Sequence, residues 1–281
     1  MIFSSKGWLT FSSSMLLSCC IFSPQSAPSA LRERDVDVVV YGATSAGVAA
    51  AVQVSRMGRS VLLIEPGGHV GGLSAGGLGA TDSGNKSAIG GIARGFYQRL
   101  GTHYAHDDAW KFQSHVDYLR DNPRTGNGEM WFFEPHVAEA AFVKMLAEAN
   151  VRVLFGQRLD LKQGVRKEGN RIRSIVMESG AGFRASMFID ATYEGDLMAL
   201  AGVSYAVGRE ANSQYDETLN GVQTRHDKYH NFEVPIDPYI IEGDPASGLL
   251  PGVQADGPGN DGEADRRIQA YNFRMCLTNV S

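Results

Sequence analysis

A cluster of small residues followed by an acidic side chain carries the clearest chemistry in this sequence. Gly42 and Gly47 enclose residues 43–46, which are all small. Small residues at the start of a helix leave backbone N–H groups open to a pyrophosphate. Glu65 follows about 20 positions later, where a carboxylate can accept hydrogen bonds from two ribose hydroxyls. The pattern therefore predicts a dinucleotide-binding site.

These residues need a strand, a helix and a second strand to position them. Residues 36–41 are a continuous apolar, β-branched run, typical of a parallel strand buried on both faces. The alanine-rich stretch 47–58 predicts a helix, and residues 61–64 predict the second strand. Thr44 stands where the GxGxxG fingerprint has its middle glycine, so the order of elements carries the assignment. We predict an α/β, Rossmann-like domain with a parallel central sheet; the alternative is a βαβ unit whose glycines serve packing alone.

The residues after Glu65 predict further elements of the same domain. Residues 66–95 are rich in glycine, as expected of backbone that comes close to a ligand. A helical insertion is expected at about 96–134, and Pro135 marks the start of a further helix. Its expected apolar face is Val137, Ala140, Ala141, Val143, Met145 and Leu146. Three more strands are predicted at 151–155, 171–179 and 183–192, the last two forming a hairpin that returns to the main sheet.

The segments DVVVYGATSAG and DATYEGD, with Glu65 and the pair Gly71 and Gly72, together resemble a known family. They are similar to the two-dinucleotide-binding-domain flavoproteins, in particular the FAD-dependent oxidoreductases related to fumarate reductase flavoproteins. The resemblance implies FAD extended along the strand ends, with Glu65 at the adenosine ribose. It implies that Gly42, Thr44, Ser45, Ala46 and Gly47 contact the pyrophosphate. It further implies that Gly71, Gly72, Leu73, Ser74 and the residues up to Gly76 contact the flavin half, Val153 and Leu154 the adenine, and Ala191 and Thr192 the strand leading back to the cofactor.

Several side chains are candidates for proton transfer or substrate contact. His69 adjoins the flavin-side glycines and ranks first, with a solvent-facing or structural histidine as the alternative. The other candidates are His103, His106, His136, His226, His230, Tyr193 and Arg274, while Asp82 and Asp196 are expected to cap loops. Tyr193 replaces a glycine that the family has after its DAT-like segment. His226 and His230 have the spacing of metal ligands, but no third ligand accompanies them, so we predict no metal site.

Composition narrows the class of protein. The 281 residues carry a net charge of −5, and no strongly basic segment indicates nucleic acid as a partner. The first 30 residues resemble a secretory signal peptide, with cleavage expected near Ala27 or Ala30. The segment MLLSC within them also resembles a bacterial lipobox that would place a lipid anchor on Cys19. We therefore expect an exported protein, either periplasmic or extracellular. Cys276, the one cysteine outside this leader, is interpreted as a small apolar core residue.

The expected domains are a leader at 1–30, an FAD-binding domain at 31–205 and the start of a substrate domain at 206–281. The resemblance covers only the first part of the family's length, so we expect a fragment that binds FAD weakly. The predicted function is hydride transfer between flavin and a small organic substrate, with carbohydrate derivatives among the candidates. The alternatives are an NAD(P)-dependent dehydrogenase with the same first βαβ unit, a polysaccharide-processing protein similar to xanthan lyases, and a noncatalytic remnant.

Overall fold

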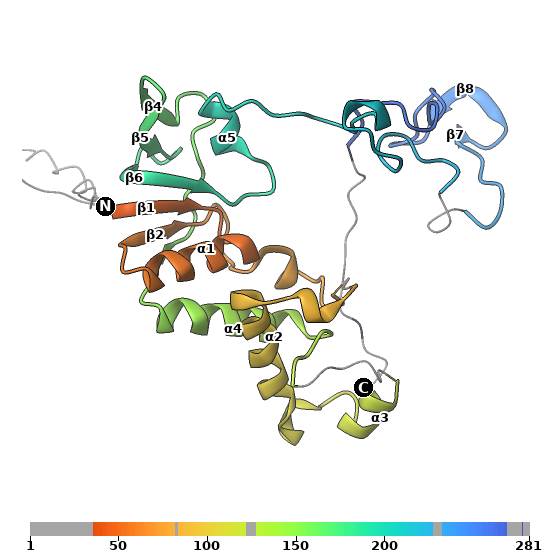
Figure 1. The fold of residues 1–281 in the computed structure, drawn as a ribbon. Coiled ribbons are helices and arrows are strands. Elements are labelled where there is room, and N and C mark those ends of the chain that lie inside the picture. The colour runs from red at the N-terminus through yellow and green to blue at the C-terminus, as the bar shows by residue number, and fades with distance from the viewer. Residues whose placement is uncertain (1–35, 82–83, 122–127, 227–231, 269–276, 278–281) are drawn as a thin grey trace, which may run out of the picture.

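The computed structural model describes residues 36–81, 84–121, 128–226, 232–268 and Leu277. Its body is a six-stranded sheet with the strand order β3-β2-β1-β6-β5-β4 (Figure 1). The strands are β1 (Val36–Tyr41), β2 (Val61–Ile64), β3 (Arg152–Leu154), β4 (Val165–Glu168), β5 (Arg171–Val176) and β6 (Gly182–Asp190). The first four strands in this order run parallel, and β5 and β4 add an antiparallel hairpin. This arrangement confirms the predicted Rossmann-like α/β fold.

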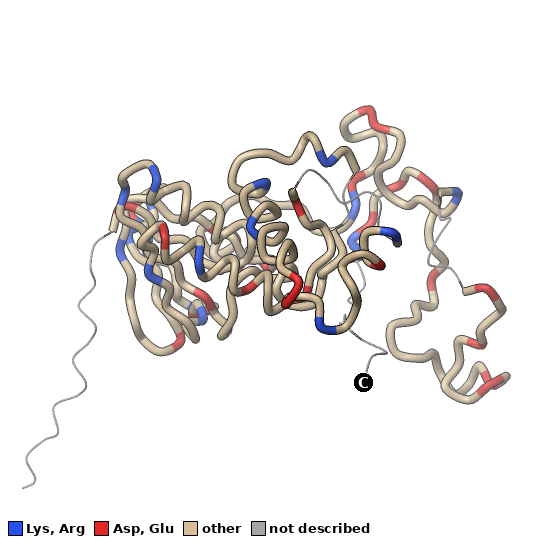
Figure 2. Tube along the Cα trace, turned by 90° about the horizontal axis from the view of Figure 1, so that it is seen from below, with Lys and Arg blue, Asp and Glu red and all other residues tan. Residues whose placement is uncertain are grey.

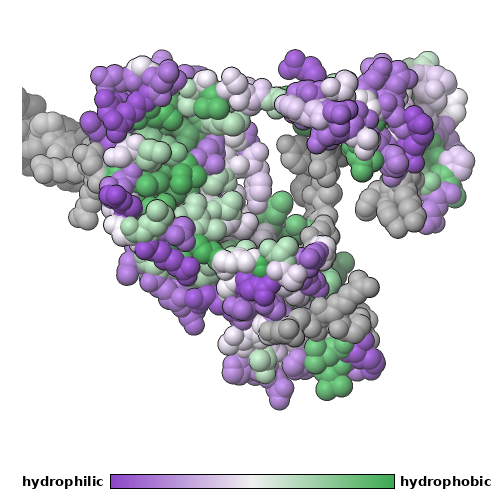
Figure 3. Space-filling model, in the orientation of Figure 1, coloured by the Kyte–Doolittle hydropathy of each residue, from purple (hydrophilic) through white to green (hydrophobic). Residues whose placement is uncertain are grey.

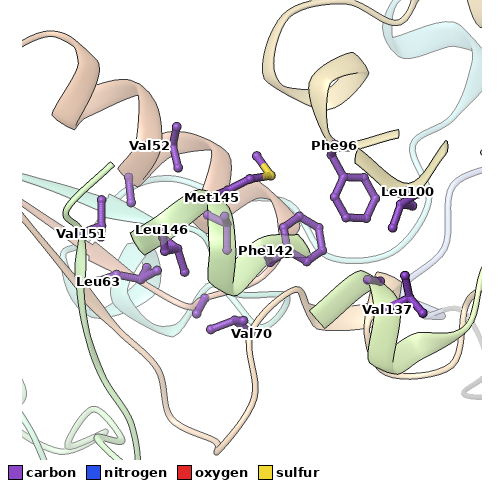
Figure 4. Close-up of a cluster of buried hydrophobic side chains, with 14 of the residues drawn as sticks. Val52, Leu63, Val70, Phe96, Leu100, Val137, Phe142, Met145, Leu146 and Val151 are labelled. Atoms are coloured by element: carbon purple, nitrogen blue, oxygen red, sulfur yellow. The ribbon is translucent and has the colours of Figure 1, made fainter. Parts of the chain in front are cut away.

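Three helices cover one face of the parallel strands and form the larger hydrophobic core (Figures 1 and 4). They are α1 (Ser45–Arg56), α2 (Gly91–Tyr104) and α4 (Pro135–Glu148). Val38 and Val40 of β1 contribute to this core. Val39 and Tyr41 belong to the second core, on the opposite face, which also contains side chains of β5, β6 and α5 (Asp196–Leu200). The alternation explains why β1 is apolar throughout, since both of its faces are buried.

The helices differ from the prediction in ways that local hydrogen bonds and packing explain. Helix α1 begins at Ser45, before the predicted start at Gly47, because Thr44 caps it. In α4, Ala140 and Val143 are exposed, so placing them on the apolar face was wrong. The buried residues of α4 are Val137, Ala138, Phe142, Met145 and Leu146. The aromatic Phe142 turns this face by stacking on Phe96 of α2, at 4.2 Å between ring centroids.

Two parts of the chain lie outside the central sheet. The helical insertion contains the end of α2 and the short helix α3 (His115–Asp121). Residues 205–268 lie to one side of the body in Figure 1 and contain the hairpin of β7 (Tyr239–Ile241) and β8 (Asp244–Leu249). Acidic residues outnumber basic ones along this stretch, whereas charges of both signs are interspersed over the body (Figure 2). The domain boundaries at 205 and 281 stay predictions, and the leader 1–30 lies outside the described residues.

Candidate functional site

The candidate site is a cavity of about 760 Å³ at the carboxyl ends of β1, β2 and β6. In an open α/β sheet, ligands bind outside the carboxyl ends of the strands, where neighbouring connections leave in opposite directions. The connection after β1 leads into α1 on one face, and α5, after β6, packs on the other. Six residues singled out by their sequence positions line the cavity: Gly42, Thr44, Glu65, His69, Gly72 and Thr192.

Gly42 and Gly47 are glycines because the backbone leaves no room for a side chain. Gly42 has a φ of +95°, and a Cβ there would lie 2.8 Å from Cγ2 of Thr192. A Cβ on Gly47 would lie 1.9 Å from the carbonyl oxygen of Gly42, well inside contact distance. The two glycines thus let the turn after β1, the first turn of α1 and the segment after β6 pack directly against each other.

Thr44 performs a structural task at the position where the fingerprint has glycine. Its Oγ1 accepts a hydrogen bond from the N–H of Gly47 at 3.2 Å and so caps α1. The same hydroxyl donates to the carbonyl oxygen of Ala191 at 2.7 Å, which joins the turn after β1 to the end of β6. The single hydroxyl proton is therefore used within the protein, and Thr44 offers its backbone to a ligand in the cavity.

Glu65, at the end of β2, lies on the cavity wall with its carboxylate held by two backbone amides. Oε2 accepts from the N–H of Ala43 at 2.6 Å, and Oε1 accepts from the N–H of Gly67 at 2.7 Å. A carboxylate oxygen has two lone pairs, so each oxygen can accept one further hydrogen bond. Two acceptors fixed on one wall match the pair of hydroxyls on a ribose.

The glycine pair after β2 forms a tight turn against two aromatic side chains. Gly71 and Gly72 have φ values of +98° and +54°, and Gly72 begins the 3-10 turn η1 (Gly72–Ser74). A Cβ on Gly71 would lie 2.4 Å from the ring of Phe142. A Cβ on Gly72 would lie 2.2 Å from the hydroxyl of Tyr193, which accepts a hydrogen bond from the N–H of Leu73 at 2.8 Å. Tyr193 therefore fastens the 71–74 turn to the segment after β6.

The segment after β6 is folded around the carboxylate of Asp190. Oδ1 accepts from the N–H and the hydroxyl of Thr192, at 3.0 and 2.6 Å, and Oδ2 accepts from the N–H of Met198 at 2.9 Å. Ala191 donates its N–H to the carbonyl oxygen of Tyr41 at 2.8 Å and so continues the pairing of β6 with β1. Asp190 thus shapes the turn that carries Thr192 and Tyr193 to the cavity.

The remaining predicted residues separate into those on the cavity wall and those away from it. Tyr193, His136 and Asp196 line the cavity. Ser45, Ala46, Gly47, Gly71, Leu73, Ser74, Val153, Leu154 and Ala191 do not line it, and Val153 packs against the helix-side core. His226 is exposed and away from it. Asp82, His230, Arg274, Cys19 and Cys276 lie outside the described residues.

His69 stands at the rim of the cavity and is paired with a carboxylate. Its Nδ1 lies 2.9 Å from Oε1 of Glu139 on α4, and its side chain is 84% exposed. With Nδ1–H donating to the carboxylate, Nε2 is left as the proton acceptor of the ring. The partner was not predicted, because nothing in the sequence joins residue 69 to a helix that begins at Pro135.

Arg158 is a further cavity residue that the sequence reasoning missed. It follows the end of β3 by a few positions, and side chains beyond the carboxyl ends of parallel strands are the ones to search for ligand contacts. The rim also carries the carboxyl groups of Glu194 and Asp196. Positive potential for a pyrophosphate therefore comes from Arg158 and from the N-terminus of α1.

The geometry fits the two ends of a dinucleotide cofactor. A helix N-terminus packed against a glycine turn, an anchored carboxylate at the end of the next strand and a cavity along three strand ends define a Rossmann-type dinucleotide-binding protein. A sequence model of the FAD dependent oxidoreductase family matches residues 37–281. The chain belongs to this family, and its cofactor is FAD. The family and cofactor predicted from the sequence are thereby confirmed.

Solved structures with a similar fold share little sequence with this chain. L-proline dehydrogenase from P. horikoshii is 14% identical, with a TM-score of 0.40 over 64% of this chain and 59% of its own. L-amino acid deaminase from Proteus vulgaris is 14% identical, with a TM-score of 0.43 over 73% and 54%. A geranylgeranyl bacteriochlorophyll reductase-like protein from Thermoplasma acidophilum is 21% identical, with a TM-score of 0.39 over 61% and 43%. The chain thus spans about three fifths or less of these proteins.

No curated protein sequence matched the chain in the same comparison. Within the described residues, no three His, Cys, Asp or Glu side chains are grouped so that they could hold a metal ion. In the same part of the chain, no helix combines the length and apolar character needed to cross a membrane.

Proposed function

We propose that this chain forms the FAD-binding part of an oxidoreductase that transfers hydride between a small organic substrate and the flavin. The observation that carries the proposal is the carboxylate of Glu65, which two backbone amides hold at the cavity wall beside the capped N-terminus of α1. FAD supplies, when bound, the two-electron chemistry that protein side chains lack. The protein supplies binding, orientation and proton transfer.

The roles of the cavity residues follow from their contacts. Glu65 receives the ribose hydroxyls, and the backbone at Gly42 and Thr44 with the N-terminus of α1 receives the pyrophosphate. Gly72, held by Tyr193, lies at the flavin half of the site. His69 holds a proton at Nδ1 toward Glu139 and presents Nε2 as a base at the rim. These assignments join the sequence prediction to one continuous cavity wall.

The direct test is reconstitution of the full chain with FAD. We expect a flavin absorbance spectrum that survives gel filtration, and quenching of flavin fluorescence on titration with the protein. Substitution of Glu65 by alanine weakens this binding by about tenfold, because one hydrogen-bonded carboxylate contributes about 1.5 kcal/mol or more. Flavin-free protein after reconstitution, together with saturable binding of NAD or NADP, contradicts the proposal and favours the nicotinamide alternative.

We also propose export of the protein, supported by the charged, apolar and small-residue sections of residues 1–30. Mass spectrometry of the mature N-terminus distinguishes the two routes. Cleavage near Ala27 or Ala30 indicates a secretory signal, whereas a lipid-modified Cys19 at the N-terminus indicates a lipoprotein. A retained Met1 in protein recovered from the producing cell contradicts both routes.

A further inference from the structure

Two more cavities lie in the helical insertion, next to the N-terminus of α4. The larger, of about 910 Å³, has six aromatic side chains in its wall: Tyr104, Trp110, Phe112, Tyr118, Phe132 and Phe133. The smaller, of about 700 Å³, is polar, and its wall includes His103, His106, Asp108 and His136. An apolar cavity with a few polar groups at one end is the usual form of a small-molecule site.

The cavities are joined to each other and to the FAD cavity by shared wall residues. Lys111, Phe112 and Glu134 line both the aromatic and the polar cavity. His136 lines both the polar cavity and the FAD cavity. The first turn of α4 therefore separates the FAD cavity from a pair of connected cavities, and a ligand held there would lie beside the cofactor.

The aromatic wall is fixed on one side and open on the other. The ring of Trp110 stacks on His115 at 4.8 Å, and its Nε1 donates to the carbonyl oxygen of Tyr104 at 2.8 Å. Phe112 and Phe132, by contrast, are 52% and 40% exposed. Figure 3 shows hydrophobic residues gathered at the surface beside α3. The cavity thus offers preformed apolar surface to a ring-sized group.

The charges around the two cavities select the other end of the ligand. Lys111 is the one Lys or Arg in either wall, and the described part of the chain gives it no ion-pair partner. Asp108 and Glu134 are the carboxyl groups nearby, and Glu134 already accepts a hydrogen bond from the hydroxyl of Tyr104 at 3.0 Å. One unpaired cation facing two carboxyl groups suits a single negative charge and disfavours a phosphate dianion.

We infer that the connected cavities bind a monocarboxylic acid with an apolar, ring-sized body. The body lies against Phe112 and Phe132, and the carboxylate lies at Lys111, on the side of the polar cavity. The inference rests on the proposed function only in making this acid the substrate of the oxidoreductase. Binding itself depends on residues outside the FAD cavity and can be measured separately.

Calorimetric titration of the full chain with four probes tests the inference. The probes are 3-phenylpropionate, 3-phenylpropan-1-ol, 3-phenylpropylamine and glucuronate. We expect the phenyl acid to bind, the alcohol to bind about fivefold more weakly, as for the loss of one exposed charge pair, and the amine to bind more weakly still. Glucuronate has the charge without the apolar body, so we expect no binding. Tighter binding of glucuronate than of the phenyl acid overturns the inference and indicates a sugar site.

Matched variants locate the site. Lys111→Met is expected to lower the affinity for the phenyl acid about fivefold and to leave the alcohol unchanged, whereas Lys144→Met, on the exposed side of α4, changes neither. Phe112→Ala is expected to weaken both phenyl compounds. Circular dichroism checks folding, and flavin fluorescence measures FAD binding in the same samples. Acid binding in protein that fails to take up FAD contradicts the proposed function alone, whereas FAD uptake without acid binding overturns this inference alone.

Discussion

The Oε2 atom of Glu65 lies 2.6 Å from the backbone nitrogen of Ala43. This hydrogen bond joins the end of β2 to the turn after β1, and the second carboxylate oxygen holds the N–H of Gly67. The residue that is expected to grip the ribose is therefore also a connector between the two loops that form the wall of the cavity. Stability and cofactor binding are coupled through one carboxylate.

Replacing Glu65 separates these two contributions. Glu65→Ala leaves two amides without their acceptor, so we expect a loss of about 1–3 kcal/mol in the free energy of unfolding. Glu65→Gln retains one acceptor oxygen and should lose less. Urea unfolding followed by circular dichroism measures both values, with Glu178→Ala, an exposed residue remote from the cavity, as the control. Equal stability of the alanine variant and the control contradicts the connecting role.

The glycines of the first turn give a prediction with opposite signs at two sites. Gly47→Ala places a Cβ 1.9 Å from the backbone oxygen of Gly42, so we expect destabilisation of about 3 kcal/mol or insoluble protein. Gly95→Ala, within α2, meets no atom within 4 Å and should stabilise the protein by about 0.5–1 kcal/mol. Thermal unfolding of both variants checks the pair. A stable Gly47→Ala protein contradicts the close packing described at this turn.

The sequence was sufficient for the parts of the fold that local patterns specify. Strands β1 and β2 were predicted with the bounds that the structure has, because both are apolar runs closed by a glycine or an acidic residue. Strand β4 was missed, because its residues, Val165–Glu168, are mostly charged and exposed. A strand that buries little of its surface has no apolar pattern from which to be recognised.

The candidate site divides in the same way. Glu65 could be found from its distance to Gly42, since that spacing is fixed by one βαβ unit. The pairing of His69 with Glu139, and of Tyr193 with Leu73, depends on how distant segments pack. Thr44 shows a third case, since a residue that departs from the fingerprint fits because its hydroxyl bonds to Ala191. Such contacts have no signal in local composition or spacing.

Tyr118, in the wall of the aromatic cavity, predicts a dependence of stability on alkaline pH. Burial raises the pKa of its hydroxyl from 10.0 to about 12. The folded protein therefore holds this proton more tightly than the unfolded chain, so the contribution to stability is complete below pH 10 and is lost as the pH rises toward 12. We expect Tyr118→Phe to reduce the fall in unfolding free energy over this range by at most about 2 kcal/mol. Urea unfolding at several pH values measures the difference, and parallel curves for the two proteins contradict it.

Tyr193 provides the most specific test of how the flavin half of the site is built. Its hydroxyl accepts from the N–H of Leu73, while its ring is 60% exposed, so Tyr193→Phe should leave the free energy of unfolding within about 0.5 kcal/mol of the parent value. The released turn must be ordered again when FAD binds, so we expect the FAD dissociation constant to rise about fivefold. Flavin fluorescence quenching measures it, with Tyr205→Phe, a similarly exposed tyrosine away from the cavity, as the control. If both phenylalanine variants bind FAD like the parent, the hydrogen bond to Leu73 does not position the turn, and the glycine pair alone is responsible for its shape.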